Sequence, residues 1–325
     1  MISRRDVLMG AAISGAVAMA RRSALALAAA SQPATPVNFQ VPSGACDCHT
    51  HIFGDLRRFP FSAARTYTPE PASAGEMQAL HRALHTDRVV IIQPSVYGTD
   101  NACTLDAMRQ IGPSARGVAV IDDKTPEAAL DEMDRAGIRG IRVNLLTIGQ
   151  TDPLVGRQRF RAAVDRIGRR HWHIQMYAGL TVIAAVKDEI IAAGIPVVFD
   201  HFGGAQGSLG VRQPGFEVLL DLLRAGHAYV KLSAPYRGST IGPDYADMVP
   251  LAKALIAANL QRILWGTDWP HPDTSPSASR RATDVTPLLQ IDDGRVFNHL
   301  AVWAPDPAER RTILVENPAR LYGYQ

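Results

Sequence analysis

Cysteine and unbalanced charge are both scarce in this sequence, and their scarcity narrows what the protein can be. Three cysteines in 325 residues cannot form a disulfide scaffold, and a chain of this length needs none to bury a core. Four arginines and one aspartate within residues 1–30 account for the formal net charge of +3, so the rest of the chain is neutral. A neutral body lacks the basic surface that is typical of nucleic-acid binding.

Phosphate-binding motifs are missing as well. No G-x-G-x-x-G follows the first expected strand, and no P-loop occurs in the chain. The sequence therefore offers no support for a nucleotide site. Its composition, 46% hydrophobic and 20% charged, is that of a folded globular protein and excludes disordered and fibrous classes.

The first 30 residues have the pattern of an export signal. Paired arginines, Arg4 and Arg5, precede an apolar run at 7–20, which is too short to span a bilayer comfortably. The pair resembles a twin-arginine signal, and residues 24–30 offer several A-x-A cleavage sites. We expect a signal at 1–30, an extension at 31–44 and a periplasmic location. The alternative is a charged terminus followed by a buried helix.

From residue 45 to residue 325, short runs rich in valine and isoleucine alternate with helical patterns. Eight repeats of this unit favour a single-domain α/β fold, a (β/α)₈ TIM barrel with extra C-terminal helices near 305–315 across its base. Gly137 and Gly194 follow two of the helical stretches, where helices often end. The expected strands are 45–53, 88–93, 117–121, 138–145, 173–178, 196–201, 228–233 and 262–266, and the expected helices include 125–136, 157–170, 182–193 and 245–259.

Polar residues collect at the ends of these strands, where a barrel places its chemistry. Along the first strand, alternation puts Asp47, His49 and His51 on one face and Cys46 and Cys48 on the other. Two imidazoles on one face could hold a divalent metal or stabilise an oxyanion. They could also be buried structural histidines.

Two further strand ends carry candidate groups. His201 ends the sixth strand and is followed by Phe202 and two glycines, so it is placed to face a ligand. Asp268 follows the eighth strand, and partial desolvation there would suit a general base. The alternative for His201 is a structural histidine, and for Asp268 a helix cap or an ion pair.

Together these motifs resemble the amidohydrolase superfamily, in its amidohydrolase-2 branch. The likeness rests on D-x-H-x-H at 47–51, D-H at 200–201 and G-T-D-W-P-H at 266–271, and it covers nearly the whole chain after the signal. It is strongest with the group of pyrone-dicarboxylate hydrolases, sulfomuconolactone hydrolases and galactarolactone isomerases.

The resemblance implies roles for the strand-end residues. Asp268 would deprotonate water, while His49, His201 and Tyr177 polarise a lactone carbonyl beside His51. Tyr177 stands where metal-dependent members have a histidine, which favours a metal-free site. The alternative is one divalent ion, Zn or Mn, on His49, His51 and Asp268.

The resemblance also implies substrate contacts, which are Ser95, Arg142, Arg237, Tyr67, Asp273 and His271. Arginine suits bidentate capture of a carboxylate or sulfonate. Ile148 and Gly204 replace two arginines of the pyrone hydrolase, and Asp273 replaces an asparagine. A substrate with one anionic group is therefore expected.

The resulting hypothesis is a periplasmic hydrolase that opens a lactone or similar cyclic ester. Alternatives are a lactone isomerase, a metal-dependent amidohydrolase or decarboxylase, and a non-catalytic periplasmic binding protein. The expected partner is a small-molecule substrate, with no nucleic acid, no membrane for the mature form, and a monomer or homodimer.

Overall fold

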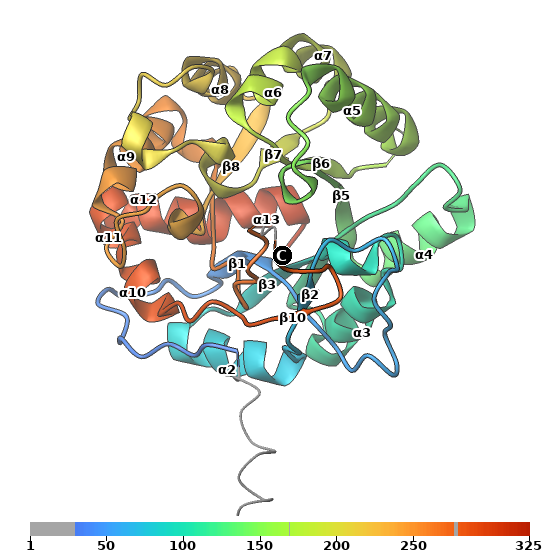
Figure 1. Cartoon of the computed structure of the whole chain (residues 1–325). Coiled ribbons are helices and arrows are strands. Elements are labelled where there is room, and N and C mark those ends of the chain that lie inside the picture. The colour runs from blue at the N-terminus through green and yellow to red at the C-terminus, as the bar shows by residue number, and fades with distance from the viewer. Residues whose placement is uncertain (1–29, 169, 276–278) are drawn as a thin grey trace, which may run out of the picture.

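The computed structural model of the chain describes residues 30–168, 170–275 and 279–325. Eight parallel strands form one sheet in the order β1-β3-β4-β5-β6-β7-β8-β9 (Figure 1). All eight expected strands are present; six are one to four residues shorter than predicted, and β4 lies two residues earlier in the chain. They are β1 (Cys46–Thr50), β3 (Arg88–Ile92), β4 (Ala115–Ala119), β5 (Ile138–Asn144), β6 (His173–Tyr177), β7 (Val197–Phe199), β8 (Ala228–Ser233) and β9 (Ile263–Gly266).

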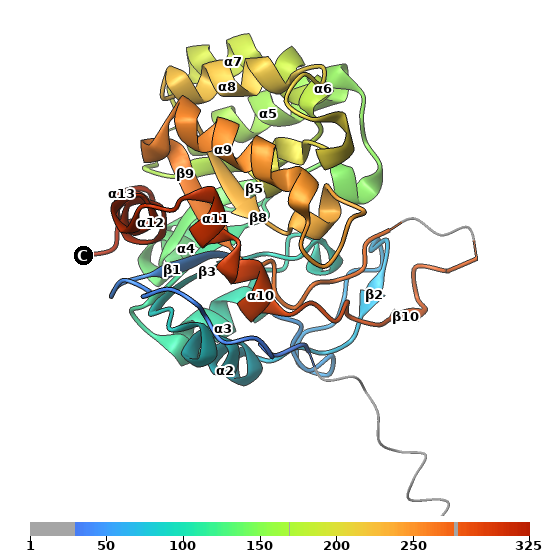
Figure 2. The ribbon, with the colours of Figure 1, turned by 90° about the vertical axis from the view of Figure 1, so that its left-hand side faces the viewer.

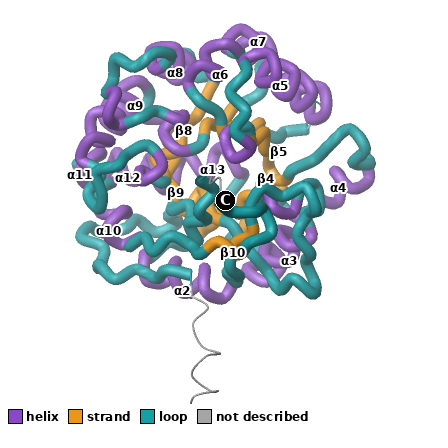
Figure 3. The backbone as a smooth tube through the Cα atoms, in the orientation of Figure 1, coloured by secondary structure: helices purple, strands orange, loops and turns teal. Residues whose placement is uncertain are grey.

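The sheet curls into a barrel because its first and last strands meet. Thr50 and Trp269 form a parallel bridge just beyond β9, and the amide of Asp268 donates to the carbonyl of His49 over 2.8 Å. Figure 3 shows the strands gathered at the centre of a ring of helices. The (β/α)₈ barrel expected from the sequence is thus confirmed.

The helices cover the outside of the barrel and one of its ends. Figure 2 shows α12 and α13 at one end, with the small sheet of β2 (Thr68–Pro69) and β10 (Val285–Thr286) towards the other. The helices are α2 (Ala74–Leu84), α3 (Ala102–Ile111), α4 (Glu127–Ala136), α5 (Pro153–Ile167), α6 (Leu180–Ala185), α7 (Lys187–Ala193), α8 (Phe216–Arg224), α9 (Val249–Ala258), α10 (Asp293–Asn298), α11 (Leu300–Trp303), α12 (Pro307–Arg311) and α13 (Asn317–Tyr322).

Several helix boundaries differ from the sequence expectation for local reasons. The helix expected from 157 begins at Pro153, because the Asp152 side chain caps the amide of Leu154. The helix expected at 182–193 is divided into α6 and α7 at Val186, whose backbone (φ −97°, ψ 7°) leaves the helical region. The helix expected at 305–315 changes to a π-helical turn at Thr312–Glu316.

The two sides of the sheet form separate apolar clusters. The larger lies between the strands and the helices, and the smaller fills the base of the barrel around Cys46, Val90 and Leu264. Tyr322 of α13 and Tyr324 close this base, so the expected C-terminal cap comes mainly from the last residues of the chain. Burial of these two tyrosine rings stabilises the end of the barrel that lies opposite to the carboxyl ends of the strands.

The segment at 31–44 packs against the barrel. The carbonyl of Ser31 accepts a hydrogen bond from the Trp269 indole over 3.0 Å, and Thr35 bonds Asp292 at the start of α10. The export signal expected at 1–30 lies, apart from Ala30, outside the described residues. No helix in the described ranges combines the length and apolar character needed to cross a bilayer.

Candidate active site

The carboxyl ends of the strands surround a small cavity of about 260 Å³. It lies where a barrel of this class places its functional groups, at the carboxyl ends of the strands. Its walls come from segments far apart in the sequence, and they bring together most of the predicted site residues. The lining residues are His51, Tyr67, Ser95, Arg142, Asn144, Thr147, Tyr177, His201, Arg237, Asp268, Pro272 and Thr274.

Asp268 lies at the centre of this arrangement, fully buried and with a positive φ of 68°. Its Oδ2 accepts hydrogen bonds from the Tyr236 hydroxyl and from Nε of Arg237, both over 2.7 Å. Its Oδ1 has no hydrogen-bond partner among the described residues. One oxygen is therefore fixed and the other is left for chemistry.

Three imidazoles face the free oxygen. Nε2 of His49, His51 and His201 lies 3.4, 3.5 and 3.6 Å from Oδ1 of Asp268. Each ring is held through Nδ1, which contacts Oδ1 of Asp200 at 3.2 Å in His49, the Ile92 carbonyl at 2.8 Å in His51, and the Ser233 hydroxyl at 2.8 Å in His201. Anchoring at Nδ1 is typical of histidines that present Nε2 to a metal or a reacting group.

The anchors assign the proton on His51 and His201. The Ile92 carbonyl only accepts, so Nδ1 of His51 carries the hydrogen and its Nε2 presents a lone pair. Nδ1 of His49 contacts both an acceptor, Asp200 at 3.2 Å, and a donor, the Lys231 ammonium at 3.4 Å, so its anchors fit either tautomer. The serine hydroxyl beside His201 can donate to Nδ1, and Nε2 faces the Asp268 carboxylate, which only accepts, so Nε2 of that ring carries the hydrogen. Burial lowers the pKa of His49 and His51, and it lowers the pKa of His201 to about 4, so all three rings are neutral at pH 7.

The carboxylate in the middle of the rings is ionised. Burial alone would raise the pKa of Asp268, but the charge of Arg237 and the contacts with His201, His51 and His49 together outweigh it and hold the pKa well below its ordinary value. Partial desolvation of Asp268 was expected from the sequence; the direct contact with Arg237, which stabilises the ionised form, was not. Asp268 is a permanent anion and a weaker base than a desolvated carboxylate would be.

A buried network beneath His49 was not predicted from the sequence. Asp200 accepts from Arg142 over 3.2 Å and from Gln175 over 3.1 Å, and Lys231 lies 3.5 Å away with no exposed surface. The only sequence signal was the alternation on β6 and β8, which turns Gln175 and Lys231 towards the barrel axis. The network joins the expected anion-binding Arg142 to the imidazole of His49.

His271 belongs to a second buried chain and not to the cavity wall. Its Nδ1 lies 3.1 Å from the Tyr236 hydroxyl, and its Nε2 lies 2.9 Å from Asp293 of α10. The ring has no exposed surface and does not line the cavity, so the direct contact between His271 and substrate stays a prediction. The chain Asp293–His271–Tyr236 supports Asp268 from behind.

The remaining predicted contacts lie on the cavity wall or next to it. Tyr67 and Ser95 both line the cavity. Arg237 is also held by Thr274 and the Pro272 carbonyl, so Arg142, whose Nε is buried without a described partner, is the freer guanidinium.

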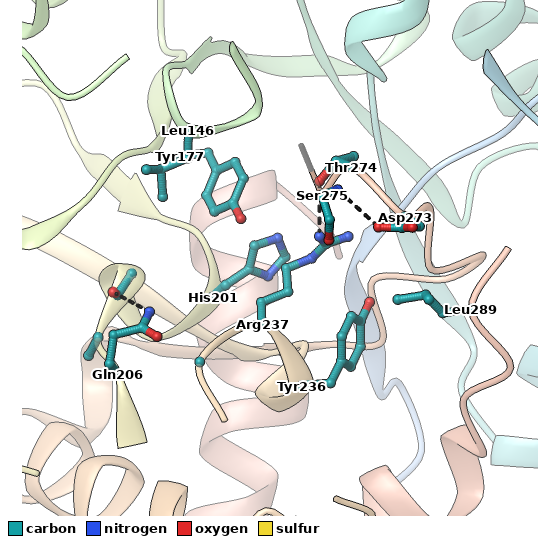
Figure 4. A pocket seen from close by; sticks show the side chains of 13 residues that line it. Leu146, Tyr177, His201, Gln206, Tyr236, Arg237, Asp273, Thr274, Ser275 and Leu289 are labelled. Atoms are coloured by element: carbon teal, nitrogen blue, oxygen red, sulfur yellow. Dashed lines mark hydrogen bonds between the residues drawn. The ribbon is translucent and has the colours of Figure 1, made fainter. Parts of the chain in front are cut away.

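Figure 4 shows a second pocket, called the mouth below, that adjoins the small cavity. Tyr177, His201 and Arg237 converge there. Asp273 lies there, 3.1 Å from Arg280 and outside the small cavity. Burial raises the pKa of Tyr177, so its phenol remains a hydrogen-bond donor at neutral pH.

Asp47 does not share a face with His49, contrary to the alternation expected along β1. The pairing of β1 with β3 changes register between Asp47 and Thr50, so simple alternation fails there. Asp47 instead accepts from the Thr267 hydroxyl over 2.6 Å and contacts His81 of α2 at 3.1 Å. Cys46 and Cys48 pack in the base cluster of the barrel.

Comparison with known proteins places the chain in a family. The sequence matches the amidohydrolase family over residues 46–324, and the protein is a hydrolase that belongs to this family. It is 34% identical to 4-sulfomuconolactone hydrolase of Hydrogenophaga intermedia, over 89% of this chain and 91% of that protein. It is 33% identical to 2-pyrone-4,6-dicarboxylate hydrolase of Comamonas testosteroni, over 89% and 93%.

Solved structures agree with this placement. A putative 2-pyrone-4,6-dicarboxylic acid hydrolase from Pseudomonas putida shares 29% identity and a TM-score of 0.72, over 88% of this chain and 98% of that one. The resemblance inferred from the strand-end motifs is confirmed, and so is membership in the hydrolase class.

Proposed function

We propose that the protein opens a lactone that carries one carboxylate or sulfonate group, adding water across the ring ester. The observation that carries this proposal is the free, buried Oδ1 of Asp268, which faces a cavity beside the donors His201 and Tyr177 and the cation Arg142. Relatives that act on anionic lactones, as their names state, support the same substrate class.

The reaction follows from the protonation states. Water attacks the lactone carbonyl carbon while its proton passes to Oδ1 of Asp268. Nε2–H of His201 and the Tyr177 hydroxyl stabilise the oxyanion that forms. The ring C–O bond then breaks, and the proton held by Asp268 passes to the departing ring oxygen, leaving an open-chain acid. His201 and Tyr177 carry the carbonyl contact because both line the cavity, whereas His49, the third residue expected from the sequence, does not line it.

Anion binding falls to Arg142 with Ser95 nearby. Arg142 is 9% exposed, and its Nε is a buried donor without a described partner. A buried donor left unpaired costs about 1–3 kcal/mol, which a bound carboxylate or sulfonate would recover. Arg237 acts mainly on Asp268 in this proposal, because three contacts already hold its guanidinium.

A second candidate, hydrolysis assisted by one divalent ion, rests on the same cluster. Ligand atoms of His49, His201 and Asp268 lie within 4.8 Å of one another, and the His51 ring faces the same oxygen. Tetrahedral zinc, with bonds of about 2.0–2.1 Å, places its ligand atoms roughly 3.3–3.5 Å apart, close to the observed spacings. The residues therefore fit such an ion, which would polarise the carbonyl and activate water. Opposing it, Arg142, Arg237 and Lys231 add positive charge around the cluster.

The test is ring opening of a panel of anionic lactones by purified protein, followed by acid release, before and after exhaustive chelation. Metal content is measured on the same samples by mass spectrometry. Activity that persists in metal-free protein supports Asp268 acting alone. Activity that is lost on chelation and restored by zinc or manganese assigns the cluster to a metal. Protein that opens no lactone contradicts the proposed function.

A further inference from the structure

A second, larger cavity adjoins the reaction cavity. It spans about 1690 Å³, open solvent included, between β5, the turn after β4 and α5, against about 260 Å³ measured in the same way around Asp268. Three residues, Ser95, Arg142 and Asn144, line both spaces and so form the junction between them. We call this larger cavity the side groove.

The walls of the side groove are apolar. Val143 of β5 and Ile121 after β4 are half-buried along it, and Ile148 at its rim is 52% exposed. Ala162 and Ala163 of α5 face it with side chains too short to fill it. Apolar side chains left exposed in a concave space mark a place where a ligand removes water.

The junction differs in character from these walls. Nε of Arg142 and Nδ2 of Asn144 are buried donors without a hydrogen-bond partner among the described residues. They require an acceptor, and an anionic group bound between the two cavities would supply it. A substrate held there by its anion has its reacting ring on the Asp268 side and any further substituent on the groove side.

The charges on the rim argue against a second anion in the side groove. Asp122 and Asp123 stand on one side; on the other, Arg166 is paired with Glu127 and Arg159 adds one cation, which the two carboxylates outnumber. The mouth shown in Figure 4 is lined by Gln206, Asp273 and Ser275 beside Leu146 and Leu289 and is more polar than the side groove, so an apolar substituent is better placed in the side groove.

We infer that the side groove binds an apolar arm of the substrate, an alkyl or aryl substituent attached next to the anionic group. This inference rests on the proposed function for the ring chemistry, but the arm can be tested by binding alone. The substrate class becomes an anionic lactone with a hydrophobic substituent, and not a compact dicarboxylate.

The binding experiment uses linear alkanesulfonates from methyl to octyl, titrated calorimetrically into the full-length protein below their micelle concentrations. Each methylene buried in the side groove should tighten binding about three- to fourfold until the groove is filled. Ile148→Glu and Ile121→Glu should remove most of this gain and leave methanesulfonate affinity unchanged. Ile191→Glu on α7, where Ile191 is 41% exposed, is the matched control and should behave as wild type.

Equal affinity for short and long sulfonates overturns the inference, as does an equal loss of the chain-length gain in the control. Because this readout needs no turnover, it separates the arm from the ring chemistry: a chain-length gain without lactone opening retains the groove and rejects the proposed reaction. Thermal unfolding of each variant shows that the fold is kept. In the activity assay, alkyl-substituted anionic lactones should show at least tenfold higher kcat/KM than unsubstituted ones, and Ile148→Glu should abolish the difference.

Discussion

The two carboxylate oxygens of Asp268 differ in their hydrogen bonding. Oδ2 accepts from Tyr236 and Arg237 at 2.7 Å, and behind Tyr236 a buried chain continues through His271 to Asp293. Oδ1 meets only imidazole nitrogens at 3.4–3.6 Å, with no hydrogen bond to a described residue. The satisfied side provides rigidity, and the unsatisfied side provides reactivity.

The charge of Asp268 determines which group donates and which accepts in the hydrogen bonds of the supporting chain. An ionised Asp268 can only accept, so the Tyr236 hydroxyl donates to it, and Nδ1–H of His271 donates to the Tyr236 oxygen, while Nε2 of His271 and the Asp293 carboxyl share a second proton over 2.9 Å. Each link is therefore fixed by the one before it, and the carboxylate cannot rotate without breaking several contacts. The same fold thus holds one oxygen still while keeping the other available.

The largest effect is expected when the unsatisfied side loses its charge. Asp268→Asn keeps the shape but removes the proton acceptor, so kcat for lactone opening should fall by about 10²–10⁴-fold. The matched control is Asp188→Asn, an exposed carboxylate on α7, which should leave kcat unchanged. Activity retained in Asp268→Asn, with the mutation verified by mass, would contradict the role given to Asp268.

Replacing one tyrosine on each side of Asp268 should have an intermediate effect on kcat and allows the two sides to be compared. Tyr177→Phe removes a donor that faces the cavity, and we expect kcat to fall about 10²-fold with little change in KM. Tyr236→Phe removes one of two bonds to Oδ2 while Arg237 keeps the other, so a loss of about five- to tenfold is expected. Steady-state kinetics of both variants on one lactone measures the difference. The reverse order would show that Oδ2 matters more than the facing donors.

The sequence predicted the strands and their termini because both depend on local pattern and on the direction of parallel strands. The sequence also predicted that five residues lie together at one end of the barrel, as they do in the structure: Asp268, His49, His51, His201 and Tyr177. It could not predict the pairing of Asp200 with Lys231 or of His271 with Asp293, since those contacts join segments 22–31 residues apart through tertiary packing. The direction of Asp47 was wrong because a register shift is not visible in an alternating pattern.

The smallest effect concerns a histidine at the base of the barrel, away from Asp268. His173 is 1% exposed, neither ring nitrogen has a described hydrogen-bond partner, and burial lowers its pKa to about 3. The unfolded chain binds a proton at this residue below about pH 6.5, while the folded protein stays neutral until about pH 3. The free energy of unfolding therefore falls with decreasing pH in that window, by up to about 1.4 kcal/mol per pH unit from this group.

His173→Phe removes this contribution while keeping a ring of similar size. We expect the variant to match or exceed wild-type stability at pH 7, and the difference in its favour to grow as the pH is lowered from 6.5 to 4.5. Urea unfolding at several pH values measures the difference, and lactone opening at pH 7 should stay within twofold of wild type. Parallel pH profiles for the two proteins would show that His173 is not held neutral. Unlike the imidazoles around Asp268, which are held at Nδ1 and open at Nε2, His173 has both nitrogens buried without partners, and replacing it should cost no activity.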